Sequence, residues 1–253
     1  MAAPHAFLEA LLRWGDSTLI LGHRLSEWCG HAPALEEDIA LANVALDLIG
    51  QARFWLDLAG KIEGAGRDAD KLAYLRDANA YRNHLLVEQK NGDFAATMTR
   101  QFLFDAWHYL FLTELQRSAD QRVADIAAKA LKEVAYHLER SRDWVIRLGN
   151  GTEESHRRTR RAVELLWPFT GELFAMDEID RVMVERGAGV DLAVLRQPWL
   201  DLVRATFDEA TLPLPDPDAW MQQGGKRGRH TELLGYLLAE MQFVQRAYPG
   251  ATW

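Results

Sequence analysis

One segment of this chain constrains its fold more than any other: residues 35–60 are apolar almost all round a helix and contain no histidine. The interior-type polar residues of the segment, Asn43, Asp47 and Gln51, lie four apart. A helix therefore places them on a single face. In a helical bundle that face points at the other helices, which is where some bundles bind a pair of metal ions. The sequence predicts a bundle helix in this position without the imidazole that a metal site needs.

Helical periodicity extends over the whole chain. Apolar residues recur at intervals of three and four, and alternating β-branched runs are absent. Cap and stop residues predict helices over residues 16–28, 35–60, 70–84, 94–117, 120–148, 157–174, 177–185, 191–209 and 231–248. We expect an all-α, ferritin-like four-helix bundle at about 16–149 with a C-terminal helical extension at about 152–253, together one domain of residues 1–253.

Composition narrows the classes of partner. The formal charge of −8 argues against a nucleic-acid partner, because phosphate binding needs a basic face. Charged residues interrupt every apolar run before it could cross a bilayer, and the N-terminus lacks a signal-peptide pattern. Cys29 is the only cysteine, so we expect a buried, inert thiol and a reducing, cytoplasmic location. Nine tryptophans are consistent with a large protein interface.

The polar residues of the predicted bundle follow the pattern of a dinuclear carboxylate site only in part. Such a site takes about four carboxylates and two histidines, commonly as Glu-x-x-His on two of the helices. The second helix has Gly50 where Asp47 would need a histidine three residues later. The third helix has Asp105 and His108 at the required spacing, but with the shorter acid.

The other two bundle helices depart further from that pattern. The fourth has Glu133 and His137, four residues apart, so both side chains can still face inward. The first contributes His23, Arg24 and Glu27. None of the four predicted bundle helices therefore carries the Glu-x-x-His motif of a dinuclear site.

We interpret these side chains as a degenerate metal site, in which buried ion pairs neutralise one another without a metal. Arg24 favours this interpretation, because a guanidinium that faces the bundle carboxylates replaces the charge of a metal ion. The proposed polar core comprises His23, Arg24, Glu27, Asn43, Asp47, Asp105, His108, Glu133 and His137, with Asp47, Asp105 and Glu133 as the carboxylates for Arg24. Two alternatives stay open: a working metal site of Asp105, His108, Glu133 and His137, or exposure of these side chains on solvated faces.

Other motifs predict local structure rather than chemistry. Glu153 and His156 match Glu-x-x-His, but they begin a helix beside Thr152, which indicates capping. Residues 212–218, LPLPDPD, predict a rigid extended connector, and residues 224–230, GGKRGRH, a mobile, solvated basic loop. The sequence contains no phosphate-binding glycine loop, Ser-His-Asp order or dinucleotide fingerprint.

Six segments carry a specific resemblance to a known family. They are LGHRLSEWCGHAPALEEDIALANVALDLIGQAR, LLVEQKNGDFA, FDAWH, KEVAYHLERS, LGNGT and GGKRGRHTELLGYLLAEMQ. These segments resemble the C subunits of bacterial 1,2-phenylacetyl-CoA epoxidase, and the resemblance spans nearly the whole chain. That enzyme is a multicomponent di-iron monooxygenase of aerobic phenylacetate degradation, which forms the ring-1,2-epoxide with O₂ and with electrons that a separate reductase takes from NADPH.

The resemblance implies a supporting role for the chain. In the family the iron is bound by the A subunit, while the C subunit has the same ferritin-like fold without a working metal site and stabilises A. We therefore expect no catalytic residue, no metal and no cofactor on this chain. The implied partners are the A subunit, the small B subunit and phenylacetyl-CoA at a shared entrance.

The resemblance also implies contacts with the acyl-CoA. By analogy these fall on two segments: Ala80, Tyr81, Arg82 and Asn83, and Arg181, Val182 and Met183. Tyr81 would stack on adenine, and the two arginines would bind phosphates. A solvated helix end is the simpler alternative. The basic cluster of Lys226, Arg227, Arg229 and His230 is expected to be solvated, with an acidic partner or a CoA phosphate as its alternative ligand.

Two competing functions remain. The chain could be an active di-metal oxygenase that uses Asp105, His108, Glu133 and His137, or a free-standing helical scaffold that binds acyl-CoA by itself. Stoichiometric metal would support the first, and binding of phenylacetyl-CoA to the isolated chain would support the second.

Overall fold

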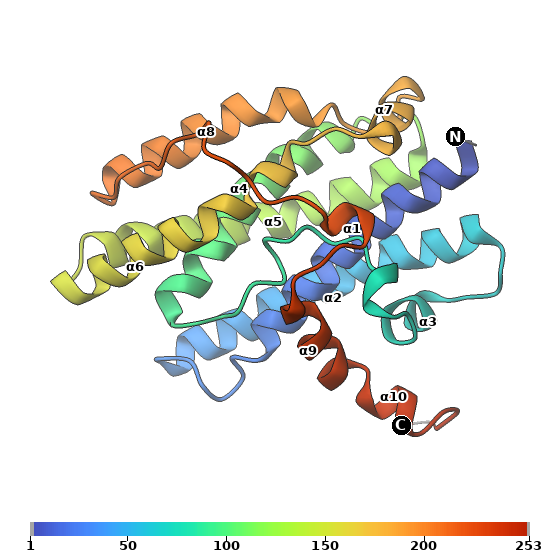
Figure 1. Cartoon of the computed structure of the whole chain (residues 1–253), viewed down its shortest axis with the longest axis horizontal. Helices are drawn as coiled ribbons and strands as arrows, with labels where there is room; N and C mark the ends of the chain where they lie inside the picture. Colours follow the sequence, from blue (N-terminus) through green and yellow to red (C-terminus); the bar gives the residue numbers. More distant parts are fainter. Residues whose placement is uncertain (1–2, 252–253) are drawn as a thin grey trace. The chain divides into compact units, whose positions relative to one another are not determined.

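The computed structural model describes residues 3–251, and every regular element in this range is a helix (Figure 1). The α-helices are α1 (Ala3–Ser26), α2 (Leu35–Glu63), α3 (Ala69–Tyr74), α4 (Phe94–Leu115), α5 (Gln121–Gly149), α6 (Glu153–Leu166), α7 (Glu178–Glu185), α8 (Leu192–Glu209), α9 (Glu232–Met241) and α10 (Phe243–Ala247). Four single 3₁₀ turns within this range are η1 (Ala78–Ala80), η2 (Trp167–Phe169), η3 (Gly171–Leu173) and η4 (Gly225–Arg227). The predicted all-α class is confirmed.

Internal contacts divide the chain into two compact units. Unit 1 consists of residues 1–90 and 224–253, and unit 2 consists of residues 91–223. The C-terminal segment therefore belongs with the first two long helices rather than with its sequence neighbours. The assignment of residues 1–253 to one domain stays a prediction.

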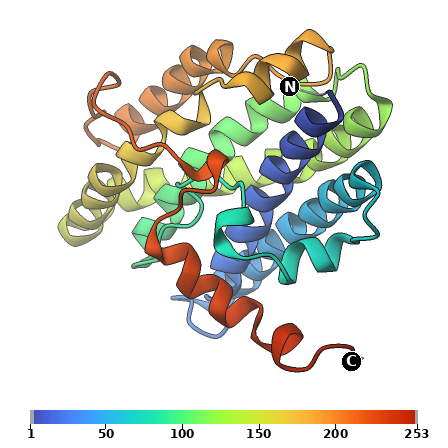
Figure 2. The same ribbon diagram turned by 45° about the vertical axis from the view of Figure 1, so that its right-hand side comes forward.

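In unit 1, α1 and α2 lie side by side along most of their lengths (Figures 1 and 2). Two glycines of α1 allow this close approach. A Cβ on Gly15 would lie 2.9 Å from the Leu56 side chain, and one on Gly22 would lie 3.1 Å from the Ala45 carbonyl oxygen. The rings of Trp14 and Trp55 meet edge to face at 5.2 Å between centroids. Two glycine positions on α1 and an aromatic pair shared by both helices thus form part of the interface of this hairpin.

The prediction that the first helix starts at Asp16 or Ser17 is wrong, because α1 begins at Ala3. Asp, Ser and Thr in succession are typical of a helix N-cap. Here the Ser17 hydroxyl donates to the Arg13 carbonyl and the Thr18 hydroxyl to the Trp14 and Gly15 carbonyls. Such bonds back to the preceding turn are compatible with a helix interior. Asp16 is instead buried and paired with a distant arginine.

The predicted helix at 70–84 is also shorter than expected. α3 ends at Tyr74, η1 forms one 3₁₀ turn, and residues 81–90 are irregular although seven of these ten residues are buried. A buried irregular segment must satisfy its backbone groups with side chains. Side chains of unit 1 bind the backbone or side chains of residues 75–90, the segment that comprises η1 and this irregular stretch.

In unit 2, α4 is the central helix and packs against α5, α6 and α8. Most of its residues are buried, which explains the absence of a polar face in its sequence. α8 reaches α4 through Trp199, whose indole nitrogen donates to the Leu103 carbonyl at 3.0 Å. The bounds of α4, α5 and α8 agree with the predictions to within two residues at each end.

The expected cap at the start of α6 is confirmed. The Thr152 hydroxyl accepts from the Ser155 backbone N–H at 3.2 Å, and His156 Nδ1 lies 2.8 Å from the Gly149 carbonyl oxygen. Glu153 and His156 therefore organise a helix start, as their position beside Thr152 indicated.

The exposure of Cys29 and the apolar character of α2 differ from what the sequence analysis predicts. Cys29, in the turn before α2, is exposed rather than buried. α2 itself has the length and composition of a membrane-spanning helix, although 44% of its most apolar window is buried within the chain, as in core helices of other proteins.

Candidate functional site

A buried carboxylate, Asp105, is the centre of the polar cluster between α4 and α5. Its Oδ1 accepts from the Gln101 amide nitrogen at 2.7 Å, and its Oδ2 accepts from the Ser141 hydroxyl at 2.9 Å. Gln101 is one turn earlier on α4, and Ser141 is on α5. Both carboxylate oxygens are thus bonded to neutral donors.

Burial sets the charges in this cluster. Burial raises the pKa of Asp105 to about 6, against the opposing effects of His137, Ser141 and Gln101. Burial and the nearby His137 lower the pKa of His108 to about 3, so this imidazole is neutral at neutral pH. His108 Nδ1 is buried and has no hydrogen-bond partner among the described residues. The cluster is therefore a low-dielectric environment in which burial disfavours the charged form of both side chains.

The residues of α4 and α5 do not fit a dinuclear metal site. Such a site needs about four carboxylates, but Asp105 is the one fully buried carboxylate that these two helices provide. Glu133 is only half-buried. Within residues 3–251, no group of three or more His, Cys, Asp or Glu side chains is arranged to hold a metal ion.

The polar stripe of α2 is not uniformly buried. Gln51 is buried, Asp47 is half-buried and Asn43 is exposed. Asn43 is therefore not part of a buried network. From Gln51 back to Asn43, the positions four residues apart move from the interior of the protein to its surface. His23 on α1 is half-buried, and burial lowers its pKa to about 4.

Arg24 anchors two distant parts of unit 1. Its Nε and one terminal nitrogen donate to the Glu88 carbonyl at 3.2 and 2.9 Å, and the same terminal nitrogen donates to the Leu233 carbonyl at 3.1 Å. The other terminal nitrogen is 2.8 Å from Glu27, which is largely exposed. These contacts give the guanidinium a structural role that the sequence did not predict, and they place Glu27 at the surface rather than in a buried core.

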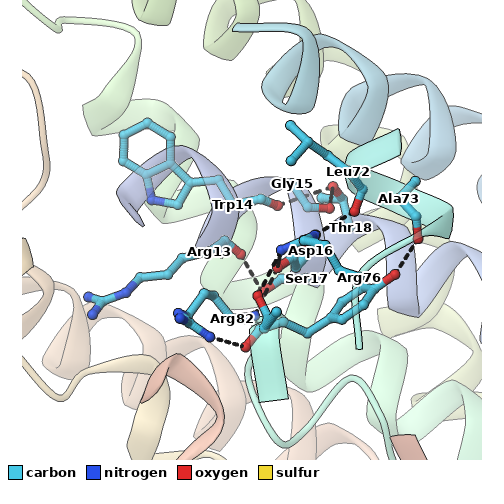
Figure 3. Close-up of polar contacts among 12 residues, drawn as sticks. Arg13, Trp14, Gly15, Asp16, Ser17, Thr18, Leu72, Ala73, Arg76 and Arg82 are labelled. Atoms are coloured by element: carbon cyan, nitrogen blue, oxygen red, sulfur yellow. Dashed lines mark hydrogen bonds and ion pairs between the residues drawn. The ribbon is translucent and has the colours of Figure 1, made fainter. Parts of the chain in front are cut away.

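A second carboxylate, Asp16 on α1, organises residues 75–90 (Figure 3). The Arg76 guanidinium binds both Asp16 oxygens, and the Arg82 backbone N–H donates to Asp16 at 2.8 Å. Arg76 also donates to the Ala80 carbonyl at 2.9 Å and lies 4.3 Å from the centre of the Tyr81 ring. Burial opposes the charge on Arg76, but Asp16 outweighs it and the pKa of Arg76 is raised. The pair fixes the irregular segment to α1.

The expected acyl-CoA contact of Tyr81 is not compatible with this geometry. Its ring is fully buried, its hydroxyl donates to the Ala73 carbonyl, and the Gln242 amide donates to it at 2.9 Å. A ring covered on both faces cannot stack on adenine. Arg82 is half-buried and paired with Glu9 at 2.7 Å, so it is not an unpaired cation for a phosphate.

The other predicted contact residues have mixed environments. Asn83 is buried and its amide nitrogen donates to Glu88 at 2.9 Å, while Ala80 is half-buried. On α7 in unit 2, Arg181 is exposed, Val182 half-buried and Met183 buried. Arg181 is therefore the one member of the second segment whose side chain is largely accessible. Contact with acyl-CoA at these positions stays a prediction.

Glu88 joins the C-terminal segment to residues 75–90. It accepts from His230 Nδ1 at 2.8 Å, from the Thr231 backbone N–H at 2.7 Å and from the Thr231 hydroxyl at 2.8 Å. His230 Nε2 lies 3.0 Å from the Tyr81 carbonyl oxygen. Both ring nitrogens thus face acceptors, which requires a doubly protonated, charged imidazole.

The pKa of His230 agrees with this assignment. Burial opposes the charged form, but the hydrogen bond and charge of Glu88, the Tyr81 carbonyl and the charge of Asp16 together raise the pKa. The expectation of a mobile, solvated loop at 224–230 is therefore wrong for its interior positions. Lys226 is also buried, whereas Arg227 and Arg229 are exposed. An acidic residue of the chain itself holds this segment.

Sequence reasoning missed Glu88, Asp16 and Arg76. Glu88 had a detectable signal, because it is a single acid after the apolar run Leu85–Val87 and before a turn. The sequence signal at Asp16 was ambiguous, because Asp16, Ser17 and Thr18 are also residue types typical of a helix N-cap. Their partners lie 60 and 142 residues away, and no local pattern identifies them.

Comparisons with known proteins agree with the resemblance seen in the sequence. A family model described as "Phenylacetic acid catabolic protein" matches residues 2–253. The chain is 52% identical over 242 residues to the C subunit of the 1,2-phenylacetyl-CoA epoxidase of Escherichia coli (strain K12). The match covers 96% of this chain and 97% of that relative.

Proposed function

The chain belongs to the family of phenylacetic acid catabolic proteins, and on this premise we propose that it is a non-catalytic, structural subunit of a 1,2-phenylacetyl-CoA epoxidase. Membership in the complex follows from the similarity to the E. coli C subunit over almost the full length of both chains. The all-α, ferritin-like fold predicted from the sequence is confirmed by the family and by the helical structure.

One observation carries the non-catalytic role: the hydrogen bonds of Asp105. Its two oxygens are occupied by Gln101 and Ser141, and its pKa is raised to about 6. Both oxygens of this carboxylate are thus satisfied by hydrogen bonds from the chain itself. The helices that would supply half of a dinuclear site thus stabilise themselves through neutral hydrogen bonds.

The partners of the chain are part of the same proposal. The catalytic A subunit would hold the iron, and the chain would support it together with the small B subunit in the cytoplasm. Di-iron chemistry in A would activate O₂, with electrons from NADPH supplied by a reductase. This chain would bind no cofactor itself.

The chain's own contribution to the phenylacetyl-CoA entrance would come from residues 75–90. The Asp16–Arg76 pair and Glu88 hold the backbone of this segment rigidly. Because the Tyr81 ring is buried, the half-buried and exposed side chains of this segment, not this ring, are the groups available to a ligand. A preorganised edge lowers the entropic cost of binding.

Reconstitution tests the proposal. The A subunit is purified with and without this chain, and epoxidation of phenylacetyl-CoA and iron content are measured. We expect high activity only with the chain, and an iron content of the complex that Asp105→Asn in this chain leaves unchanged. Equal activity of A alone would contradict the supporting role.

The second candidate function is an active di-metal oxygenase. It is favoured by the unsatisfied Nδ1 of His108, which is buried close to His137. Stoichiometric iron in the isolated chain, lost in His108→Ala and His137→Ala variants that still fold, would establish it. A free-standing acyl-CoA scaffold would instead show heat of binding when the isolated chain is titrated with phenylacetyl-CoA.

A further inference from the structure

A groove in unit 2 lies between the first turn of α4 and the exposed side of α6. Its volume is about 390 Å³, and three exposed arginines of α6 line it: Arg157, Arg158 and Arg161. Among the described residues that line the groove, Asp93 is the one acid. Asp93 caps α4, because its Oδ1 accepts from the Ala96 backbone N–H at 2.9 Å. The groove therefore has an excess of positive charge, although the whole chain carries −8.

The chain neutralises the charges of these arginines only in part. Arg157 and Arg158 share one acid, Glu154, at 2.7 and 2.6 Å. Arg158 also lies 3.6 Å from Asp93. Arg161 has no hydrogen-bond or ion-pair partner among the described residues. The three guanidinium groups thus face two carboxylates, and the N–H donors of one of these groups are available to a ligand.

The adjacent arginine of the same helix, Arg160, is neutralised in the ordinary way. Its Nε lies 3.0 Å from Glu164, four residues later. The residue four positions after Arg161 is instead Leu165, which is 60% exposed and also lines the groove. Like charges four residues apart, as in Arg157 and Arg161, repel each other along a helix, and a bound anion relieves this repulsion. The groove therefore combines an unneutralised cation with an exposed apolar side chain.

These side chains match an anion of a particular kind. Guanidinium groups bind phosphate through paired, charge-assisted hydrogen bonds, and several arginines match the several oxygens of one phosphate group. Glu154 already holds Arg157 and Arg158 in place, which lowers the entropic cost of the contact. Leu165 adds an apolar surface beside the cations. A phosphate group attached to an apolar body therefore contacts more of the groove than the inorganic ion does.

We propose that this groove binds an organic phosphate, with the phosphate group on the three arginines that line it and the apolar body on Leu165. None of the positions that the family resemblance assigns to acyl-CoA lies on α6. Because the guanidinium groups are exposed, water and salt screen them. The affinity is accordingly modest, with a dissociation constant on the order of 100 µM. This inference does not depend on the proposed function.

Calorimetric titration of the purified full chain tests the site, with phenyl phosphate and inorganic phosphate as the probes. Arg161→Ala is expected to weaken the binding of both probes at least about tenfold. Its resistance to urea should equal or exceed that of the wild type, because the substitution removes a repulsion between like charges. Arg160→Ala is the matched control, since Arg160 is exposed, paired with Glu164 and not part of the groove lining. It should change neither affinity by more than about twofold.

The two probes separate an organic phosphate from the free ion. We expect the wild type to bind phenyl phosphate about tenfold more tightly than inorganic phosphate, because the ring covers Leu165. Leu165→Asn should abolish this preference and leave the affinity for inorganic phosphate unchanged. Equal affinities of the wild type for the two probes would overturn the assignment to an organic ligand. Equal weakening by Arg160→Ala and Arg161→Ala would show attraction by the general charge of α6 and would overturn the site.

A wild type that binds neither probe at concentrations up to about 10 mM would overturn the proposal altogether. If Arg161→Ala in that case reduced co-purification with the A subunit, the groove would be a docking surface for acidic side chains of a protein instead. That result would leave the proposed function standing, since the function depends on the activity of A with and without this chain.

Discussion

The polar cluster of α4 and α5 and the ion pairs of unit 1 solve the same problem in opposite ways. Both bury groups that are charged in water. Around Asp105 the protein suppresses charge, raising the pKa of the acid and lowering that of His108. Around Asp16 and Glu88 it pairs each acid with a basic side chain, Arg76 and His230 respectively. A buried acid without a cation shifts toward neutrality, whereas one with a cation stays ionised.

The largest expected effect comes from breaking a charged pair. Asp16→Ala leaves the buried Arg76 guanidinium without its carboxylate. We expect a loss of about 3–5 kcal/mol in the free energy of unfolding, because an uncompensated buried charge is strongly destabilising. Urea unfolding at neutral pH measures it. Glu9→Gln, at the more exposed pair with Arg82, is the matched control and should cost less than about 1 kcal/mol. Equal losses would contradict the distinction.

Loss of Glu88 should release the C-terminal segment. Glu88→Gln keeps the shape but removes the charge that His230 faces, and it converts one acceptor of the Thr231 contacts into a donor. We expect a loss of about 2–3 kcal/mol, in the range of hydrogen bonds to charged groups. Faster tryptic cleavage after Arg227 and Arg229 reports the release. Cleavage at the wild-type rate would show that the apolar contacts of α9 suffice to hold the segment.

Removing the charge of Asp105 should have the opposite sign. Its pKa is about 6 in the folded protein against roughly 3.9 when unfolded, so the wild type loses stability as the pH rises through this interval. Asp105→Asn abolishes that loss. We expect the variant to be more stable than the wild type by about 1–3 kcal/mol at pH 8, and not at pH 4. A destabilised variant at pH 8 would indicate that the ionised carboxylate has a cation partner.

We expect the smallest effect in the pH dependence of the thermal stability of unit 1, to which His230 contributes. The folded pKa of His230 is raised, so its contribution is fully present below the unfolded value of about 6.5 and is lost as the pH rises through the folded pKa. Thermal unfolding between pH 6 and 9 should show this decline in the wild type. His230→Gln should show a flatter profile. An unchanged slope would mean that the imidazole is neutral in the folded state.

The helices of this protein were largely predictable from local sequence. α2, α4, α5, α7 and α8 follow from apolar periodicity, whereas the helix predicted at 157–174 is α6, which begins at Glu153 and ends at Leu166. Asp93, Asp120, Thr152, Asp177 and Asp191 accept the backbone hydrogen bonds expected of N-caps. The start of α1 was missed for a local reason as well. Ser17 and Thr18 can bond either forward as caps or backward within a helix, and sequence alone does not choose between them.

The candidate site was less accessible to prediction. The residues Asp105, His108 and His137 were identified from their spacing, because α4 and α5 are adjacent in sequence and long enough to fix their faces. Gln101 and Ser141, which donate hydrogen bonds to Asp105, carry no motif. Asn43 and Glu27 have the residue types of a polar core but lie at the surface, since the twist of a helix relative to its neighbour sets exposure.

The sequence by itself determined that this chain is helical, where most of its helices begin and end, and which family it resembles. These properties depend on contacts within a few residues or on long stretches of similar sequence. Only the tertiary structure decided that Asp16 pairs with Arg76, that Glu88 holds His230, and that Asp105 accepts hydrogen bonds from Gln101 and Ser141. Such pairs depend on distance in space and on burial, and the free energy of a buried charge is set by neighbours that the local sequence does not name.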